Sequence, residues 1–279
     1  MQPRLVGNNL KLCIEDCFKI FDHSFDRLKY FSSISNNVSV QNLPKNWDIQ
    51  NPEGLTYSIR KPEEKDHQMI VEGYKHFIGC YLLRDCIESF SLALDDMFFG
   101  LLLHGKHIHS SSRNFYDAFS VEEKKALRNF KNTGLFSDNG KVQLLKSRFQ
   151  VELPSQHNTC ISSLRDIRNC FAHANGFVRD VDGKEESEDK SKRSFYWQTI
   201  CLFVKSDSGE ESKLEMNKVI SGGGSLCLRI QTHSKSFRIG EQLSFSTSEI
   251  YEMGQSLQFI ARQYLQEIYK KFSLGQKIV

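Results

Sequence analysis

Apolar residues recur at helical spacing along most of the chain, with polar and charged residues between them. This spacing predicts helices over residues 8–33, 62–103, 120–131, 140–150, 155–176 and 246–272. Ser120 and Glu123 have the spacing of a capping box, as do Ser246 and Glu249, and both pairs stand where a predicted helix begins. Because the helix over 62–103 is the most densely apolar, we expect it at the centre of the core.

The pattern changes in the last third of the chain. Residues 195–204 are aromatic and β-branched, and residues 226–232 and 235–239 alternate between apolar and polar, which predicts strands. Residues 179–193 are almost all charged or small and predict an exposed loop, for which disorder is one interpretation. Residues 35–62 are polar and rich in Asn and Pro, and they predict a long connection.

This order of elements predicts a mainly α protein, an antiparallel helical bundle with a small β-sheet inserted before the C-terminal helix. We expect a helical bundle over residues 1–178. A charged loop and a small antiparallel β element follow over 179–243. The last helix, over 244–279, is expected to pack back on the bundle.

The composition adds few constraints on function. The net charge of +3 is compatible with nucleic-acid contact but too small to indicate it alone. The eight cysteines include no Cys-x-x-Cys pair, which argues against a zinc ribbon or a thioredoxin-type site. The amino terminus lacks the apolar segment of a signal peptide, and no apolar run approaches the ~20 residues of a membrane span. We therefore expect a reduced, cytoplasmic protein that makes no membrane contact.

The segment 165–176 carries the strongest candidate chemistry. On a helix, one arc holds the apolar residues of this segment together with the residue before it: Leu164, Ile167, Cys170 and Phe171. The opposite arc holds the polar residues Arg165, Asp166, Arg168, Asn169 and His173. An imidazole, a guanidinium and an amide on one polar face could bind a phosphodiester and move a proton. The plainer interpretation is that His173 caps carbonyls at the helix end and that Arg168 pairs with Asp166 or another acid.

The string Arg168-Asn169-Cys170-Phe171-Ala172-His173 resembles the Arg-polar-x-x-x-His motif of HEPN domains. The resemblance covers residues 60–178 and 246–272, and it makes the β segment an insertion. It implies an HEPN-like helical bundle and a homodimer in which two motifs form one composite site. Many HEPN proteins are metal-independent endoribonucleases of toxin–antitoxin, phage-defence and CRISPR systems.

Carried over to this chain, the resemblance implies that Arg168 and His173 are catalytic and that Asn169 orients the imidazole or the phosphate. Beside them, Arg165, Asp166 and Asn175 are the candidate substrate-binding residues. The expected function is therefore that of a metal-independent endoribonuclease in a toxin or antiviral defence system, with an RNA substrate and without metal or cofactor. An antitoxin or a defence-complex protein is a candidate further partner.

The alternative is a non-catalytic HEPN-like module that regulates or that binds nucleic acid or protein, since the family also contains such members. One departure concerns control of the toxin. HEPN toxins that a nucleotidyltransferase silences carry a Tyr beside the His, whereas Phe171 and Ala172 offer no hydroxyl here. That form of control is not expected for this chain.

Three other groups of residues have more than one interpretation. His104, His107 and His109 could bind zinc or contact phosphate, but no Cys or carboxylate nearby completes a zinc site, so a solvated basic loop is favoured. Asp95 and Asp96 could hold a metal, but an exposed stripe or a pairing with Lys or Arg is favoured. The aromatic rings of residues 195–197 could stack on bases, but core packing is favoured.

Overall fold

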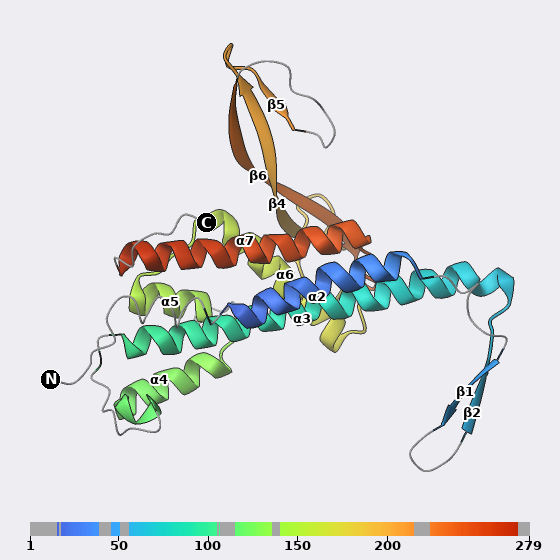
Figure 1. The fold of residues 1–279 in the computed structure, drawn as a ribbon, viewed down its shortest axis with the longest axis horizontal. Helices are drawn as coiled ribbons and strands as arrows, with labels where there is room; N and C mark the ends of the chain where they lie inside the picture. The colour runs from blue at the N-terminus through green and yellow to red at the C-terminus, as the bar shows by residue number, and fades with distance from the viewer. Residues whose placement is uncertain are drawn as a thin grey trace.

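Long helices make up the body of the molecule, and two β hairpins project from it (Figure 1). The computed structural model describes residues 16, 18–38, 46–50, 56–104, 106, 115–135, 140–214 and 224–272. The helices in this part are α2 (Lys19–Asn36), α3 (His67–Leu103), α4 (Val121–Asn132), α5 (Lys141–Phe149), α6 (Ser155–His173) and α7 (Thr247–Lys271), with short 3-10 turns at Glu64–Asp66 and Phe115–Ala118. The strands are β1 (Asn46–Gln50), β2 (Thr56–Arg60), β3 (Lys184–Glu185), β4 (Lys192–Ser206), β5 (Glu211–Lys213) and β6 (Gly224–Arg238).

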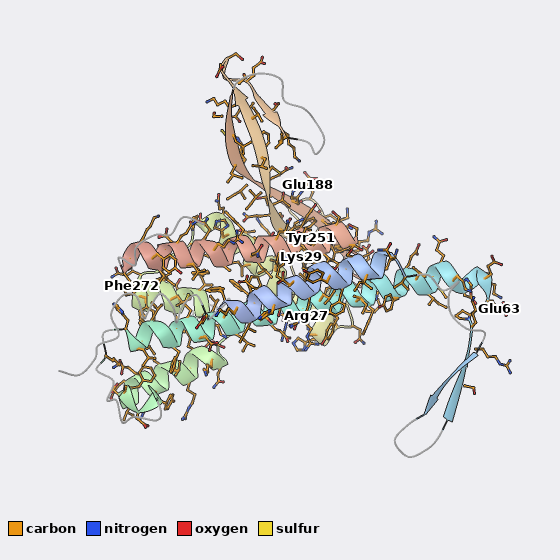
Figure 2. The ribbon with its side chains drawn as sticks, viewed as in Figure 1. Arg27, Lys29, Glu63, Glu188, Tyr251 and Phe272 are labelled. Atoms are coloured by element: carbon orange, nitrogen blue, oxygen red, sulfur yellow. The ribbon has the colours of Figure 1, made fainter. Side chains whose placement is uncertain are left out.

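Helix α3 is the centre of the bundle, as its apolar density predicts. It packs against α2, α4, α6 and α7, and most of its residues from Leu82 onward are buried. The aromatic core includes Phe21 of α2, which meets Phe90 of α3 edge to face with ring centroids 5.8 Å apart. Tyr251 of α7 stacks on Phe25 of α2 with ring centroids 5.9 Å apart, which ties α2 to α7, and Lys29 Nζ lies 5.0 Å from the centroid of the same ring. Figure 2 labels Tyr251 and Lys29 on these two helices.

Local sequence signals set several helix ends. The side chain of Ser120 accepts from the Glu123 N–H, and the Glu123 carboxylate accepts from the Ser120 N–H, which completes the predicted capping box of α4. Ser246 and Glu249 do the same at the start of α7. The predicted bounds of the other helices are confirmed to within a few residues. The exception is the first helix, because residues 8–15 lie outside the described residues.

Strands β4 and β6 form a long antiparallel hairpin, in which Ile200 is opposite Ile230 and Leu202 is opposite Leu228. β3 and β5 pair with β4 at its two ends. The base of the hairpin packs on α6 and α7, whereas its far end projects away from the bundle (Figure 1). The result is a mostly helical protein with a small antiparallel sheet and a C-terminal helix that packs back on the bundle, as predicted.

The prediction for residues 179–193 is wrong in part. The segment follows a defined path, and two of its charged residues are buried. Asp182 accepts from the Arg179 guanidinium at 2.7 and 2.9 Å, and Arg193 donates to the carbonyls of Asp180, Lys190 and Lys192. These contacts satisfy buried charges, so a segment of charged composition is nevertheless anchored.

The prediction of one long connection over 35–62 also needs correction. β1 and β2 pair over five residues each, from Asn46 opposite Arg60 to Gln50 opposite Thr56. They form a separate two-stranded hairpin that precedes α3 (Figure 1). In the part of the chain that the structure describes, no helix has the length and hydropathy needed to cross a membrane.

Candidate active site on helix α6

Helix α6 presents the two faces that its sequence predicts. Leu164, Ile167 and Cys170 are fully buried in the core. Phe171, on the same arc, is half-buried and meets the His76 ring of α3 edge to face at 6.3 Å. Burial of this arc turns the opposite arc, with Asn169 and His173, toward the surface.

The end of α6 is also set locally. The N–H groups of Ala174 and Gly176 both donate to the Cys170 carbonyl, at 3.0 and 2.9 Å. Asn175 and Gly176 adopt left-handed conformations, with φ of 50° and 85°. Glycine is favoured at such a φ, and an added Cβ at Gly176 would lie 3.4 Å from the Phe171 ring. The chain therefore turns sharply just after His173.

Arg168 is held on two sides. Its Nε and Nη2 donate to Glu88 Oε1 of α3, at 3.3 and 2.9 Å. Its Nη1 donates to Asn169 Oδ1 at 3.1 Å. Arg84 also donates to Glu88 Oε1, at 2.9 Å. The guanidinium plane is thus fixed by a carboxylate and an amide, and about 29% of the Arg168 side chain remains exposed.

The charge balance around Glu88 follows from these contacts. Partial burial acts to raise the pKa of Glu88, but the hydrogen bonds and charges of Arg84 and Arg168 outweigh it and leave the pKa below its usual value. Glu88 is therefore ionised at neutral pH. Two arginines share one carboxylate, which leaves the cluster with a net positive charge.

His173 stands apart from this cluster. It is the last residue of α6 and its side chain is exposed. Among the described residues it has no hydrogen bond or ion pair, so it does not cap helix carbonyls in this chain. Asn169 lies one turn before it on the same face. Arg168 is therefore hydrogen-bonded to Asn169, whereas the imidazole of His173 has no partner among the described residues and is accessible to a ligand.

The three candidate substrate-binding residues have different surroundings. Arg165 donates through Nε and Nη2 to Asp166 Oδ1, at 2.9 and 2.6 Å. Asp166 was expected on the polar surface, but it is buried, and burial raises its pKa although Arg165 opposes the shift. Asp166 is thus an anchor for Arg165 and is poorly placed to touch a substrate. Asn175 is exposed in the turn after α6.

A groove lies on each side of the second half of α6. One, of about 510 Å³, lies between α3 and the end of α6 and includes Phe77, Tyr81, Arg84 and Asn175 in its lining. The other, of about 540 Å³, lies between α6 and the β segment, which is the part of the chain from residue 179 to residue 243. A polymer that crosses the polar face of α6 could therefore extend into either groove.

The sequence did not identify Glu88 as part of the site. The pair Arg84 and Glu88 has the i, i+4 spacing of a helical ion pair, which is the one local signal. Its contact with Arg168 joins residues 80 positions apart, so no pattern within α6 could reveal it. The interpretation that Arg168 pairs with an acid is correct, but the acid is Glu88 and not Asp166.

Metal-ligand sets are also absent from the part of the chain that the structure describes, since no group of three or more His, Cys, Asp or Glu residues is placed to hold an ion. The ring of His104 packs against Phe272, and His107 and His109 lie outside the described residues. Cys80, in the groove beside α3, has its pKa raised by burial to about 12, so it is not a thiolate at neutral pH.

The sequence matches no protein-family model, and no curated protein or solved structure matches it either. The functional interpretation therefore depends on the residues and on their geometry.

Proposed function

We propose that this protein is a metal-independent endoribonuclease of a toxin or antiviral defence system, active as a homodimer with a composite site. The observation that carries the proposal is the arrangement on α6. A guanidinium fixed by Glu88 and Asn169 lies at the surface, and one turn beyond Asn169 an exposed imidazole ends the helix.

In this proposal the groups have separate roles. An imidazole removes the proton of the 2′-hydroxyl, whose oxygen attacks the adjacent phosphorus, and the 5′-oxygen leaves with a proton from a second acid. Arg168 neutralises the charge that develops on the non-bridging oxygens. In each subunit α6 ends on one exposed imidazole, that of His173, so the second His173 comes from the other subunit. Imidazoles titrate near neutral pH, so neither step needs a metal.

An exposed apolar stripe on α3 supports the homodimer. Ile70, Tyr74, Phe77 and Tyr81 recur at intervals of three or four residues, and all four are exposed. The stripe leads along α3 directly to Arg84 and Glu88 of the site. A second copy that covered this stripe would bring its own α6 close to the same surface.

The test is cleavage of RNA by the His173→Ala variant. We expect cleavage to fall by ~100-fold or more, because general acid–base catalysis contributes roughly that much. Activity of the unaltered protein should survive a chelator such as EDTA. The matched control is His23→Ala. This variant removes an exposed imidazole that lies on α2, away from the motif on α6, and it should leave cleavage unchanged. Cleavage that persists in His173→Ala would remove the catalytic role of this residue.

One observation favours a second candidate function, a module that binds nucleic acid without cutting it. Glu88 occupies the Nε and Nη2 edge of Arg168, and part of the positive charge is therefore neutralised before any ligand arrives. Salt-dependent RNA binding with no turnover at high protein concentration would support this module over the nuclease.

A further inference from the structure

We propose that the groove between α6 and the β segment binds the single-stranded RNA that flanks the scissile phosphate. This inference rests on the proposed function and gives the β segment a role in substrate binding. The groove has a volume of about 540 Å³, and its lining includes Asn158, Ser162 and Arg165 of α6, Lys184 of β3 and Tyr196 of β4.

The groove is aligned with the candidate active site. Its α6 residues continue into the motif at helical spacing, in the order Asn158, Ser162, Arg165, Asn169 and His173. His173 follows Asn158 by 15 residues, which is about 22 Å at ~1.5 Å per residue. A strand that lies along this face therefore passes from the groove over Asn169 to His173.

Three of the described residues that line the groove are charged, Arg165, Asp166 and Lys184, and their net positive charge suits a phosphate backbone. Arg165 is held in place by Asp166 and by Ser162 Oγ, at 2.6 and 3.3 Å from its Nη2. Lys184 is exposed and forms no ion pair within the residues that the structure describes. The nearby acid Asp182 already has a partner in Arg179. Lys184 is therefore the cation that remains available to a phosphate.

The uncharged groups suit an unpaired base. Tyr196 is half-buried, and its N–H donates to Ser163 Oγ at 2.5 Å, which fixes β4 against α6. Tyr196 is the one aromatic residue among the described residues that line the groove, and its ring is the group on which a base can stack. Asn158, Thr159 and Ser162 add neutral donors and acceptors for base edges or a 2′-hydroxyl.

The size of the groove favours a single strand. Its volume lies within the ~300–1,000 Å³ of pockets that hold one small molecule, which leaves room for one or two nucleotides and none for a duplex. Stacking also requires a base that is not already paired.

The experiment measures binding and cleavage separately. Binding of a fluorescent single-stranded RNA 12-mer is measured by anisotropy in the His173→Ala background, where the RNA is not consumed. Tyr196→Leu should raise Kd by roughly tenfold, because stacking on one aromatic ring contributes about that much. Tyr196→Phe keeps the ring and should restore binding. Lys184→Gln should raise Kd severalfold and lower the slope of log K against log salt by about 0.7.

The matched control is Lys190→Gln, an exposed lysine outside the groove, which should leave Kd unchanged. Circular dichroism reports whether Tyr196→Leu folds, and if it does not, Lys184→Gln decides alone because that side chain is exposed. An unchanged Kd in Lys184→Gln and in a folded Tyr196→Leu would overturn the inference, as would a duplex that binds more tightly than the single strand. Groove-dependent binding without cleavage by the unaltered protein would overturn the nuclease, and it would support only the RNA-binding role of the groove.

Discussion

Two of the acidic residues of helix α3, Glu88 and Asp95, form ion pairs with basic side chains in contrasting surroundings. Asp95 Oδ1 lies 2.6 Å from Lys141 Nζ, and the two side chains are 9% and 4% exposed. Glu88 binds Arg168 at 2.9 Å, and these side chains are 40% and 29% exposed. Two turns of one helix thus separate a buried ion pair from an open one.

The two pairs also shift the acid pKa in opposite directions. Burial raises the pKa of Asp95, even though Lys141 opposes the shift. For Glu88 the effect of partial burial is smaller than that of the two arginines, and the pKa is lowered. The comparison indicates that the buried pair fixes α5 against α3, whereas the open pair orients a side chain that remains available to a ligand.

The largest expected effect on stability comes from breaking the buried pair. Lys141→Met leaves Asp95 in the core without its cation, and the free energy of unfolding should fall by ~3–5 kcal/mol. Urea unfolding at fixed protein concentration measures this value. Lys146→Met, which removes an exposed partner of Glu152, is the control and should cost less than ~1 kcal/mol. A loss under 1 kcal/mol in Lys141→Met would contradict the structural role of the buried pair.

Breaking the open pair should separate activity from stability. Arg168→Met removes a cation that solvent already screens, so the free energy of unfolding should change by less than ~1 kcal/mol. RNA cleavage should nevertheless fall by ~100-fold or more, because the variant cannot neutralise the transition state. Kinetics and urea unfolding on the same preparation test both statements. A stability loss as large as that of Lys141→Met would show that Arg168 is mainly structural.

The smallest expected effect is the pH dependence of the open pair. A lowered folded-state pKa means that Glu88 stabilises the fold above its ordinary value near 4.5, and that this contribution is lost as the pH falls through the lower value. The free energy of unfolding of the wild type should therefore exceed that of Glu88→Gln by a few tenths of a kcal/mol at pH 6, and the difference should shrink as the pH falls below 4.5. Unfolding curves of both proteins across this range provide the measurement. A difference that grows on acidification would reverse the assigned sign.

The parts of the fold that the sequence predicts are those set by neighbouring residues. The capping boxes at Ser120 and Ser246 and the left-handed Gly176 after α6 depend on residues within one helical turn. The β1–β2 hairpin was not predicted, although both strands alternate between polar and apolar residues, because each strand has only five residues and lies in a segment rich in Asn and Pro. The anchored path of residues 179–193 depends on Arg193 contacts across a turn, which composition does not reveal.

The candidate site shows the same limit. The polar face of α6 follows from helical periodicity, and Asn169 and His173 lie on it as predicted. Asp166 is buried because the β segment covers that side of α6, and Glu88 reaches Arg168 because α3 packs beside it. Both facts arise from tertiary packing between distant segments, so they could not be derived from the motif alone.

The projecting hairpin has a practical consequence for handling the protein. Leu226, Leu228 and Ile230 alternate along one face of β6, and the two leucines are 63% and 70% exposed. Exposed aliphatic strands favour intermolecular β pairing and aggregation. Arg229 lies between Leu228 and Ile230 in the sequence but points to the opposite face of β6, where it forms an ion pair with Glu211. This apolar face of β6 is therefore where we expect concentrated solutions of the protein to begin to self-associate.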